Sequence, residues 1–547
     1  MNSSFTNIAS YLALMAERQP AGLAIIVPHG RAGRATYRQL NEESDRLARG
    51  LTSIGIGRGV RTVLMVQPGL EFFVLTFALF KAGAVPVLVD PGMGITNLGQ
   101  CLEEAAPEAF IGIPKAQAAR VLLGWAKASL KSVVTVGRRF FWGGYSLNKV
   151  RALGDSGIRF SPAETSADET AAILFTSGST GVPKGAVYTH GIFAAQVELL
   201  RHTYGIQPGE IDLPTFPLFA LFGPALGLTA VIPDMDFTRP GQVDPQKIVA
   251  AIEEFRVTNL FGSPALIDRV GRYGVERQIK LPSLRRVISA GAPVSAETLK
   301  RFSQLLSPGV QIFTPYGATE ALPVSSIGSE EILNETQSVT AAGGGVCVGG
   351  PVRGVTVQII GISDEPIPTW SDDLVLPADQ VGEIVVAGPV VTKEYFHRPE
   401  STASAKIQDP KTGRVLHRMG DLGCLDDRGR LWFCGRKSQR VITPAGTLFT
   451  IPCEAVFNQH PQIRRSALVG VARNGTTEPV LCVELEKNAP SDDRKRLTHE
   501  ILSLGAGQPH TKEIKTVLFH PAFPMDIRHN AKIFREKLAQ WAARKLS

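Results

Sequence analysis

One short stretch, residues 171–185, constrains the fold of this chain more than any other. It begins with the apolar run AAILF, which is typical of a short buried strand. It continues as TSGSTG, a loop of glycines and hydroxyl side chains, and Lys184 follows with a positive charge. Glycine lets the backbone turn tightly and approach a ligand, and successive backbone N–H groups bind anions. The stretch therefore predicts a strand that ends in a phosphate-binding loop.

This loop is not a Walker A motif, because that pattern ends in Gly-Lys-Ser/Thr and Pro183-Lys184-Gly185 stands here instead. A Gly/Ser-rich surface loop without a ligand is the alternative. The strand before the loop and the Pro-Lys-Gly after it favour phosphate binding. The candidate phosphate-binding residues are Thr176, Ser177, Gly178, Ser179, Thr180, Gly181 and Lys184.

The length and charge of the chain set broad limits. Its 547 residues are too many for one compact core, so we expect at least two domains. The net charge is +8, but the basic residues look dispersed and not interleaved with aromatic residues. We therefore expect no nucleic-acid partner. Attraction to anionic substrates or to a membrane surface stays open beside a basic surface without a role.

Neither the cysteines nor the apolar stretches indicate an extracellular or membrane-spanning protein. The six cysteines form no C-x-x-C pair, which argues against zinc and redox motifs and fits a reducing cytosol. The N-terminus does not read as a signal peptide. Residues 70–80 are too short to span a membrane, and prolines and glycines interrupt 213–233. We expect a cytoplasmic protein without a transmembrane segment, with association to a membrane surface left open, and we expect 213–233 to line an apolar pocket.

The order of predicted elements indicates an α/β fold. Strands at 61–66 and 84–89 alternate with helices such as 71–82, which favours a mostly parallel sheet with helices on both faces. From about residue 340 short glycine-rich strands indicate a smaller β region. We predict a large N-terminal domain of mixed and parallel sheets with flanking helices over 1–435. A small α/β domain over 436–547 completes the chain.

The loop and the motifs after it resemble those of the adenylate-forming enzymes, the superfamily of acyl-CoA synthetases, nonribosomal-peptide adenylation domains and luciferases. TPYGATE at 314–320 resembles the family motif Tyr-Gly-x-Thr-Glu, and Gly420-Asp421, Gly435-Arg436 and the late Lys532 follow in the family's order. The resemblance covers roughly residues 8 to 540. It implies ATP and Mg²⁺ as cofactors, and a small, mobile C-terminal domain that carries Lys532 into the site.

The resemblance also implies a role for each motif. Tyr316 would supply a flat surface for the base, Thr319 a hydroxyl near the α-phosphate and Glu320 a carboxylate for Mg²⁺. Lys532 would neutralise charge as a carboxylate attacks the α-phosphate. The implied catalytic residues are Thr180, Lys184, Glu320 and Lys532. The further nucleotide-binding residues are Gly291, Ala292 and Pro293 along the adenine, Gly317 beside Tyr316, and Asp421 and Arg436 at the ribose.

Several positions depart from the pattern of the coenzyme A ligases in this superfamily. Ser438 stands at the hinge, where an acidic residue or lysine is usual, and Ile442 stands where the coenzyme A loop has its lysine. Phe219-Ala220 replaces an aromatic residue followed by histidine. These departures weaken the interpretation as an ordinary coenzyme A ligase.

The amino-acid sequences of several segments resemble those of one family within the superfamily, the β-lactone synthetases of bacterial long-chain olefin biosynthesis. These segments are 142–144, 213–228, 232–236, 432–437 and 526–532. The resemblance implies a 2-alkyl-3-hydroxyalkanoic acid as substrate, an acyl-AMP intermediate and a β-lactone product. It also implies assembly with other enzymes of that pathway, such as a β-lactone decarboxylase or a reductase.

Three interpretations stay open at this point. Beside β-lactone formation stand a long-chain fatty acyl-CoA or fatty acyl-AMP ligase and a nucleotide-binding sensor without turnover. The set of candidate catalytic residues argues against the sensor. His190 and His529 are candidate bases for the substrate hydroxyl. The candidate walls of an acyl pocket, which could equally be plain core, are Phe216, Phe219, Leu221 and Phe222.

Overall fold

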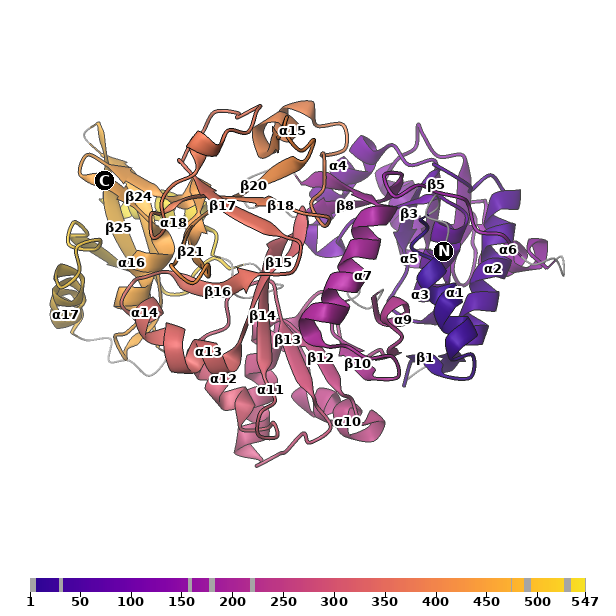
Figure 1. The fold of residues 1–547 in the computed structure, drawn as a ribbon, viewed down its shortest axis with the longest axis horizontal. Helices are drawn as coiled ribbons and strands as arrows, with labels where there is room; N and C mark the ends of the chain where they lie inside the picture. The colour runs from indigo at the N-terminus through magenta and orange to yellow at the C-terminus, as the bar shows by residue number, and fades with distance from the viewer. Residues whose placement is uncertain are drawn as a thin grey trace.

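The computed structural model describes residues 6–28, 33–155, 160–176, 183–216, 222–473, 475–486, 493–525 and 533–546. Within them the chain forms two large sheets and a smaller C-terminal α/β unit (Figure 1). Helix α7 (His190–Tyr204) lies between the two large sheets. The side chain of Thr189 caps its first turn by accepting a hydrogen bond from the N–H of Ile192.

The first sheet has seven strands in the described part of the chain, in the order β7-β6-β5-β3-β4-β8-β9. All neighbours pair in parallel except β8 and β9, which are antiparallel. The strands are β3 (Arg61–Met65), β4 (Val85–Leu88), β5 (Ala109–Gly112), β6 (Ser132–Thr135), β7 (Tyr145–Ser146), β8 (Thr170–Thr176) and β9 (Lys184–Thr189). The helices between them are α3 (Leu70–Lys81), α4 (Ile95–Ala105), α5 (Pro114–Leu123) and α6 (Leu147–Leu153). β4 and β5 are buried on both faces, as the apolar sequences of parallel strands predict.

The second sheet is mixed and its described strands follow the order β17-β18-β20-β21-β16-β15-β14-β13-β12-β10-β11-β1-β2, with β19 paired to β20. The parallel half contains β1 (Leu23–Ile26), β10 (Ile211–Pro214), β11 (Thr229–Val231), β12 (Asn259–Gly262), β13 (Arg286–Ser289) and β14 (Ile312–Ala318), with β2 (Arg34–Thr36) antiparallel at the edge. The antiparallel half contains β15 (Ala321–Gly328), β16 (Val346–Pro351), β17 (Thr356–Ile360), β18 (Gly382–Ala387), β19 (Lys406–Gln408), β20 (Val415–Leu425) and β21 (Leu431–Arg436). The predicted β region after residue 340 is thus continuous with the parallel half through β14 and β15.

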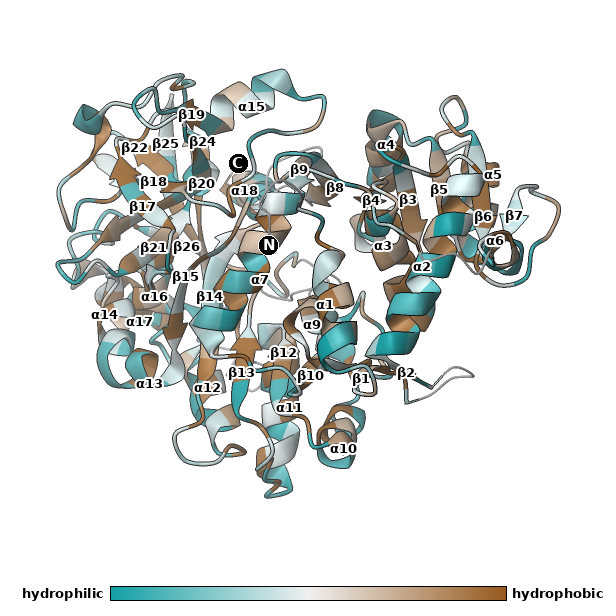
Figure 2. Cartoon of the chain, turned by 45° about the vertical axis from the view of Figure 1, so that its right-hand side comes forward, coloured by the Kyte–Doolittle hydropathy of each residue, from teal (hydrophilic) through white to brown (hydrophobic). Residues whose placement is uncertain are grey.

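The other helices of the N-terminal part pack against these sheets. The described helices are α1 (Ser10–Arg18), α2 (Tyr37–Ser53), α9 (Phe222–Leu226), α10 (Pro245–Phe255), α11 (Pro264–Glu276), α12 (Ala296–Ser303), α13 (Ser329–Glu331), α14 (Gln337–Ala341) and α15 (Pro399–Ala405). Asp244 and Ser263 cap α10 and α11, and each cap is followed by a proline that favours the first helical turn. In Figure 2 hydrophobic residues gather in the sheets and hydrophilic ones on the outer faces of the helices.

The C-terminal unit has its own core. Strands β24 (Ile463–Arg473), β25 (Thr476–Leu485) and β26 (Thr516–Phe519) form a sheet, beside the hairpin of β22 (Val441–Thr443) and β23 (Gly446–Leu448). The helices α16 (Thr450–Phe457), α17 (Arg494–Ala506) and α18 (Arg535–Leu546) accompany them. The mixed α/β architecture with a smaller C-terminal α/β unit was predicted, and it is confirmed. The boundary between residues 435 and 436 stays a prediction.

In their described residues, the two apolar stretches fold into the interior. Residues 70–80 belong to α3, which is buried almost throughout, and 213–233 pass through β10, α9 and β11. Across the described ranges, no helix combines the length and apolarity that a membrane crossing needs. The six cysteines are buried and none forms a disulfide.

Candidate active site

Tyr316, Asp421 and Arg436 come together from three strands of the second sheet. The Tyr316 hydroxyl donates a hydrogen bond of 2.7 Å to Asp421 Oδ2, and Arg436 lies 2.9 Å from Asp421 Oδ1. Tyr316 precedes Asp421 by 105 residues in the sequence. Arg436 lies on the neighbouring strand β21, as the register partner of Asp421. Three of the predicted nucleotide-binding residues therefore form one cluster.

Asp421 is almost fully buried in this cluster. Burial raises the pKa of Asp421, although Arg436 and the Tyr316 hydroxyl act in the opposite direction. The Asp421 carboxylate in turn raises the pKa of Arg436, and burial together with Asp421 holds the pKa of Tyr316 well above its ordinary value. Gly420 lies in the left-handed region at φ +67°, so the backbone favours a glycine directly before Asp421.

Glu320 is held by a segment that the sequence did not assign to the site. The Tyr395 hydroxyl donates a hydrogen bond of 2.7 Å to Glu320 Oε1. The backbone carbonyl of Glu320 accepts hydrogen bonds from the N–H and the hydroxyl of Thr392, at 2.9 and 3.2 Å. Burial and the Glu320 carboxylate raise the pKa of Tyr395 well above its ordinary value, so Tyr395 acts as a hydrogen-bond donor.

Two lysines lie near the ring of Tyr395. The Lys184 ammonium is 5.2 Å and the Lys406 ammonium 5.8 Å from the ring centroid, distances at which a cation is attracted to an aromatic face. Lys406 is buried and donates to the carbonyl and, at 3.1 Å, to the hydroxyl of Thr392. Burial lowers the pKa of Lys406 to about 7. Tyr395 therefore connects two predicted catalytic residues, Lys184 and Glu320.

The residues on either side of the predicted phosphate-binding loop are held by described contacts. Thr176 and Lys184 are register partners at the ends of β8 and β9. The Gly185 carbonyl accepts a hydrogen bond of 2.7 Å from the N–H of Phe396, and Ala186 bridges to Tyr395. The loop ends are therefore tied to the segment that holds Glu320.

Several predicted site residues lie outside the described residues. They are Ser177, Gly178, Ser179, Thr180 and Gly181 of the loop, Phe219 and Leu221 of the acyl pocket, His529 and Lys532, together with the side chain of Thr176.

The turn at 291–293 and the residues after Tyr316 lie on neighbouring strands. Gly291 follows the carboxyl end of β13 and adopts φ +99°, in the left-handed region, and Ala292 and Pro293 come directly after it. A side chain at Gly317 would meet the carbonyl of Ala321 at 2.6 Å, so only glycine fits there. The Thr319 carbonyl accepts a hydrogen bond from the Tyr188 hydroxyl. The turn and the TPYGATE motif are thus adjacent, because β13 and β14 pair in parallel.

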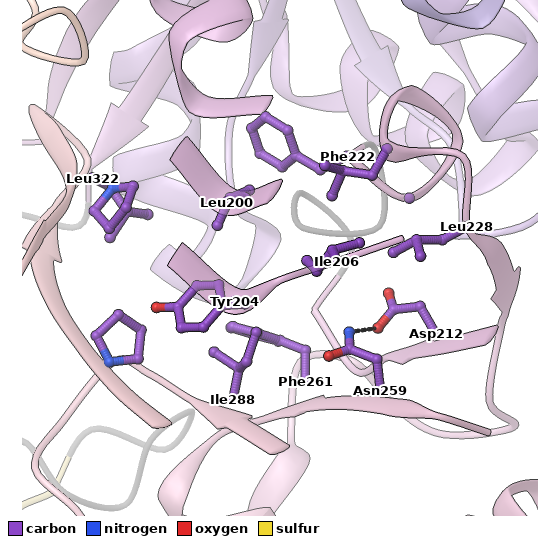
Figure 3. A pocket seen from close by; sticks show the side chains of 14 residues that line it. Leu200, Tyr204, Ile206, Asp212, Phe222, Leu228, Asn259, Phe261, Ile288 and Leu322 are labelled. Carbon is purple, nitrogen blue, oxygen red and sulfur yellow. Dashed lines mark hydrogen bonds between the residues drawn. The ribbon is translucent and has the colours of Figure 1, made fainter. Parts of the chain in front are cut away.

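An apolar cavity lies beside this cluster, between α7, α9 and the parallel half of the second sheet (Figure 3). Phe222, a predicted pocket residue, lines it together with Leu200, Tyr204, Phe261 and Ile288. Pro315, the residue before Tyr316, also lines it. Phe216, like Phe222, packs against the hydrophobic core that includes Phe261 and Ile288. The cavity therefore adjoins the predicted nucleotide-binding residues.

A polar pair interrupts the apolar lining of this cavity. Asn259 donates a hydrogen bond to Asp212, and both residues are almost fully buried (Figure 3). Asn259 Oδ1 has no donor among the described residues. Burial raises the pKa of Asp212 from 3.8 to about 7. The sequence did not single out either residue.

This raised pKa gives a pH-dependent stability that can be measured. Between about pH 4 and pH 7 the folded protein keeps the proton of Asp212 and the unfolded chain loses it, so rising pH destabilises the fold. Asp212→Asn keeps an acceptor for Asn259 but does not titrate. We expect the free energy of unfolding of this variant, relative to that of the unaltered protein, to rise by roughly 2 kcal/mol when the pH is raised from 5 to 8. Urea unfolding at both pH values checks this, and an equal pH dependence in both proteins would contradict it.

The predicted hinge residue Ser438 lies in a short 3₁₀ turn, η5 (Lys437–Gln439), directly after β21. Lys437 donates a hydrogen bond of 2.8 Å to the Ser363 carbonyl and lies 3.1 Å from Glu383. Arg440 pairs with Asp364 at 2.5 Å. The residues on both sides of Ser438 are therefore anchored to the large antiparallel half-sheet.

Glu383, which holds Lys437, also forms a buried ion pair with Arg418. We expect the loss of this pair to lower the stability of the fold. Arg418 and Glu383 are 2.7 Å apart and are 2% and 1% exposed. Arg418→Met leaves the buried Glu383 carboxylate with Lys437 as its described partner, so we expect a loss of about 3 kcal/mol, the lower end of the range for breaking a buried pair. We expect chemical denaturation to show this loss, and the double variant Arg418→Met/Glu383→Leu to recover part of it. A single variant as stable as the unaltered protein would disprove the role of the pair.

His190 is a structural residue of helix α7. Its Nδ1 accepts a hydrogen bond of 3.2 Å from the N–H of Ile8, and burial lowers its pKa to about 4. The side chain is 1% exposed. It therefore joins the N-terminal segment to α7, and its Nε2 has no hydrogen-bond partner among the described residues.

Comparisons with known proteins show what the sequence of this chain is similar to. A family model described as AMP-binding enzyme matches residues 12–396. An olefin β-lactone synthetase of Xanthomonas campestris pv. campestris is 52% identical over 552 residues, which cover 99% of this chain and 98% of the relative. An olefin β-lactone synthetase of Stenotrophomonas maltophilia is 51% identical over 99% of this chain and 98% of the relative.

Solved structures share the fold at lower identity. The amide bond synthetase from Marinactinospora thermotolerans has a TM-score of 0.80 at 22% identity and covers 98% of this chain and 99% of its own. The ATP-bound MatB from Rhodopseudomonas palustris has a TM-score of 0.78 at 23% identity, over 98% and 100% of the two chains. These likenesses concern the fold alone.

Proposed function

This chain belongs to the AMP-binding enzymes and, within them, to the olefin β-lactone synthetases, and from that premise we propose that it converts a 2-alkyl-3-hydroxyalkanoic acid into a β-lactone. The observation that carries the proposal is the 52% identity over nearly the full length of both chains. The clusters around Asp421 and Glu320 support its first half, the activation of a carboxylate by ATP.

In the first step the substrate carboxylate attacks the α-phosphorus of ATP, and acyl-AMP and pyrophosphate form. Lys184, the loop before it and Lys532 would offset the negative charge that develops on the phosphate oxygens. Asp421 and Arg436 would bind the ribose hydroxyls, and Tyr316 would lie against the base. Gly291, Ala292 and Pro293 would follow the adenine with their backbone.

Glu320 is the residue proposed to hold Mg²⁺. Tyr395 donates to one of its oxygens and Thr392 fixes its backbone, so the carboxylate is oriented by two groups. The described residues contain no cluster of three or more His, Cys, Asp or Glu that could bind a metal. A single carboxylate nevertheless fits Mg²⁺, which usually takes one or two protein carboxylates and completes its shell with phosphate oxygens and water.

In the second step the 3-hydroxyl of the same molecule attacks the activated carbonyl. A new carbon–oxygen bond closes the four-membered ring, the hydroxyl proton is lost and AMP leaves. An intramolecular hydroxyl has a high effective concentration, so no external acceptor is needed. Ser438 and Ile442, which depart from the coenzyme A ligase pattern, are consistent with a reaction that uses no thiol.

The apolar cavity beside Pro315 and Tyr316 is proposed to take one alkyl branch of the substrate. Phe222 and Ile288 would contact it. We also propose that residues 436–547 act as a lid that brings Lys532 to the α-phosphate, with Ser438 at the hinge. The six buried free cysteines support a cytoplasmic location.

Product analysis tests the proposal. The purified protein is incubated with ATP, Mg²⁺ and a 2-alkyl-3-hydroxyalkanoic acid, with and without coenzyme A. We expect the lactone, AMP and pyrophosphate in both reactions at the same rate. A thioester that forms faster than the lactone would instead identify a long-chain acyl-CoA ligase, and acyl-AMP that accumulates without ring closure would identify an acyl-AMP ligase.

A further inference from the structure

The positive charge of this chain is concentrated in one segment, in contrast to the dispersed pattern expected above. Residues 109–154 contain eight Lys and Arg and no Asp or Glu, a net charge of +8, which equals the net charge of the whole chain. The rest of the sequence is therefore neutral overall. The segment's basic residues are Lys115, Arg120, Lys127, Lys131, Arg138, Arg139, Lys149 and Arg151. It forms the β5, β6 and β7 end of the first sheet with α5 and α6.

The loop between β6 and β7 exposes large aromatic side chains within this segment. Phe141 is 89%, Phe140 46% and Tyr145 37% exposed. Trp142 donates a hydrogen bond of 2.9 Å from Nε1 to the Thr135 hydroxyl, and the rings of Phe140 and Phe141 lie 5.1 and 5.6 Å from its ring. The aromatic cluster is therefore anchored to β6 and held outward. Exposed aromatic clusters of this kind mark interaction sites.

Two arginines belong to the same loop. The Arg138 guanidinium lies 5.1 Å from the centroid of the Phe140 ring, and Arg139 donates a hydrogen bond of 2.5 Å to the Gly144 carbonyl. Both are exposed, and neither forms an ion pair with another described residue. Lys131 and Arg151, elsewhere in the segment, are instead paired with Glu108 and Glu43. Two charges without an ion pair among the described residues are thus beside the aromatic cluster, and Lys115, Arg120, Lys127 and Lys149 add further such charges to the segment.

This loop is far from the candidate active site. β7 is the edge strand of the first sheet, and α6 and β5 lie at the end of the molecule opposite the C-terminal unit (Figure 1). In Figure 2 β6 and β7 are at the outer edge, away from β14 and β20. A surface here can be covered without closing the cavity beside Tyr316.

We infer that the loop 137–145 docks the protein onto an anionic membrane surface. Aromatic side chains favour the boundary between lipid headgroups and acyl chains, and clustered Lys and Arg are attracted to anionic lipids. Projecting rings beside exposed arginines combine the apolar and the positive groups that an anionic membrane surface attracts. The inference does not depend on the proposed lactone chemistry.

Vesicle sedimentation tests the inference. The full chain is mixed with vesicles of phosphatidylcholine alone or of phosphatidylcholine with phosphatidylglycerol, at low and high salt. We expect binding to the anionic vesicles, weakened by salt, and about tenfold weaker binding for Arg138→Glu/Arg139→Glu. Phe141→Ser, at a side chain that is almost fully exposed, should weaken it several-fold without changing the unfolding temperature.

Two matched variants control for composition. Ile442→Ser removes another exposed apolar side chain, and Lys512→Glu reverses an exposed charge in the C-terminal unit. Both should bind vesicles like the unaltered protein. Equal binding to neutral and anionic vesicles, or loop variants that bind like the controls, would overturn the inference. So would a Phe141→Ser variant that changes the oligomeric state and leaves vesicle binding unchanged, because the loop would then be a protein interface.

Discussion

Replacing Glu320 with glutamine is expected to slow acyl-AMP formation by about a thousandfold. The glutamine carbonyl can still accept the hydrogen bond from Tyr395, so the local structure should persist. The substitution removes the charge that is proposed to hold Mg²⁺ against the phosphates. Pyrophosphate release at increasing Mg²⁺ measures the effect, and the variant should need more Mg²⁺ to reach half its maximal rate.

Tyr395→Phe is the matched control for this prediction. It keeps the Glu320 charge and loses one hydrogen bond, so a decrease of about tenfold is expected. The proposed role of Glu320 fails if Glu320→Gln retains more than a tenth of the activity, or if both variants are impaired equally.

Replacing Lys532 with alanine is expected to abolish acyl-AMP formation while ATP still binds. The residue resembles the late lysine of adenylate-forming enzymes, and its charge would be needed in the transition state more than in the nucleotide complex. Pyrophosphate release should fall by about three orders of magnitude or more, and equilibrium dialysis should give an ATP affinity within a few-fold of the unaltered protein.

Lys537→Ala serves as the control, because Lys537 is an exposed lysine of α18 that lies over the ring of Phe534. Its activity should stay close to that of the unaltered protein. Unchanged pyrophosphate release in Lys532→Ala would refute the catalytic role of that lysine.

The sequence predicted the parts of the site that lie in continuous motifs. Tyr316 and Asp421 are 105 residues apart, and the order of the motifs placed them in one site, as the hydrogen bond between them shows. The α/β fold followed from apolar strands such as β4 and β5, whose burial on both faces leaves a plain pattern in the sequence.

The residues that the sequence did not reveal depend on distant partners. The sequence alone does not distinguish Tyr395 from the other aromatic residues. Its role depends on the hydrogen bond that its hydroxyl donates to Glu320, 75 positions away. Lys406 begins a short strand, and only its burial against Thr392 and Tyr395 distinguishes it from a solvated lysine. The charges of 109–154 looked dispersed because they are spaced along the chain, although the fold gathers them at one end of a sheet.

The central claim is that ATP activates the substrate carboxylate and that the substrate's own alcohol then displaces AMP. A substrate with heavy oxygen in both carboxyl positions tests it directly by mass spectrometry of the products. The carboxylate attack predicts AMP with one heavy oxygen and a lactone with one heavy oxygen at its carbonyl. Unlabelled AMP, with both heavy oxygens retained in the lactone, would contradict the claim, because it would mean that the alcohol and not the carboxylate had been activated.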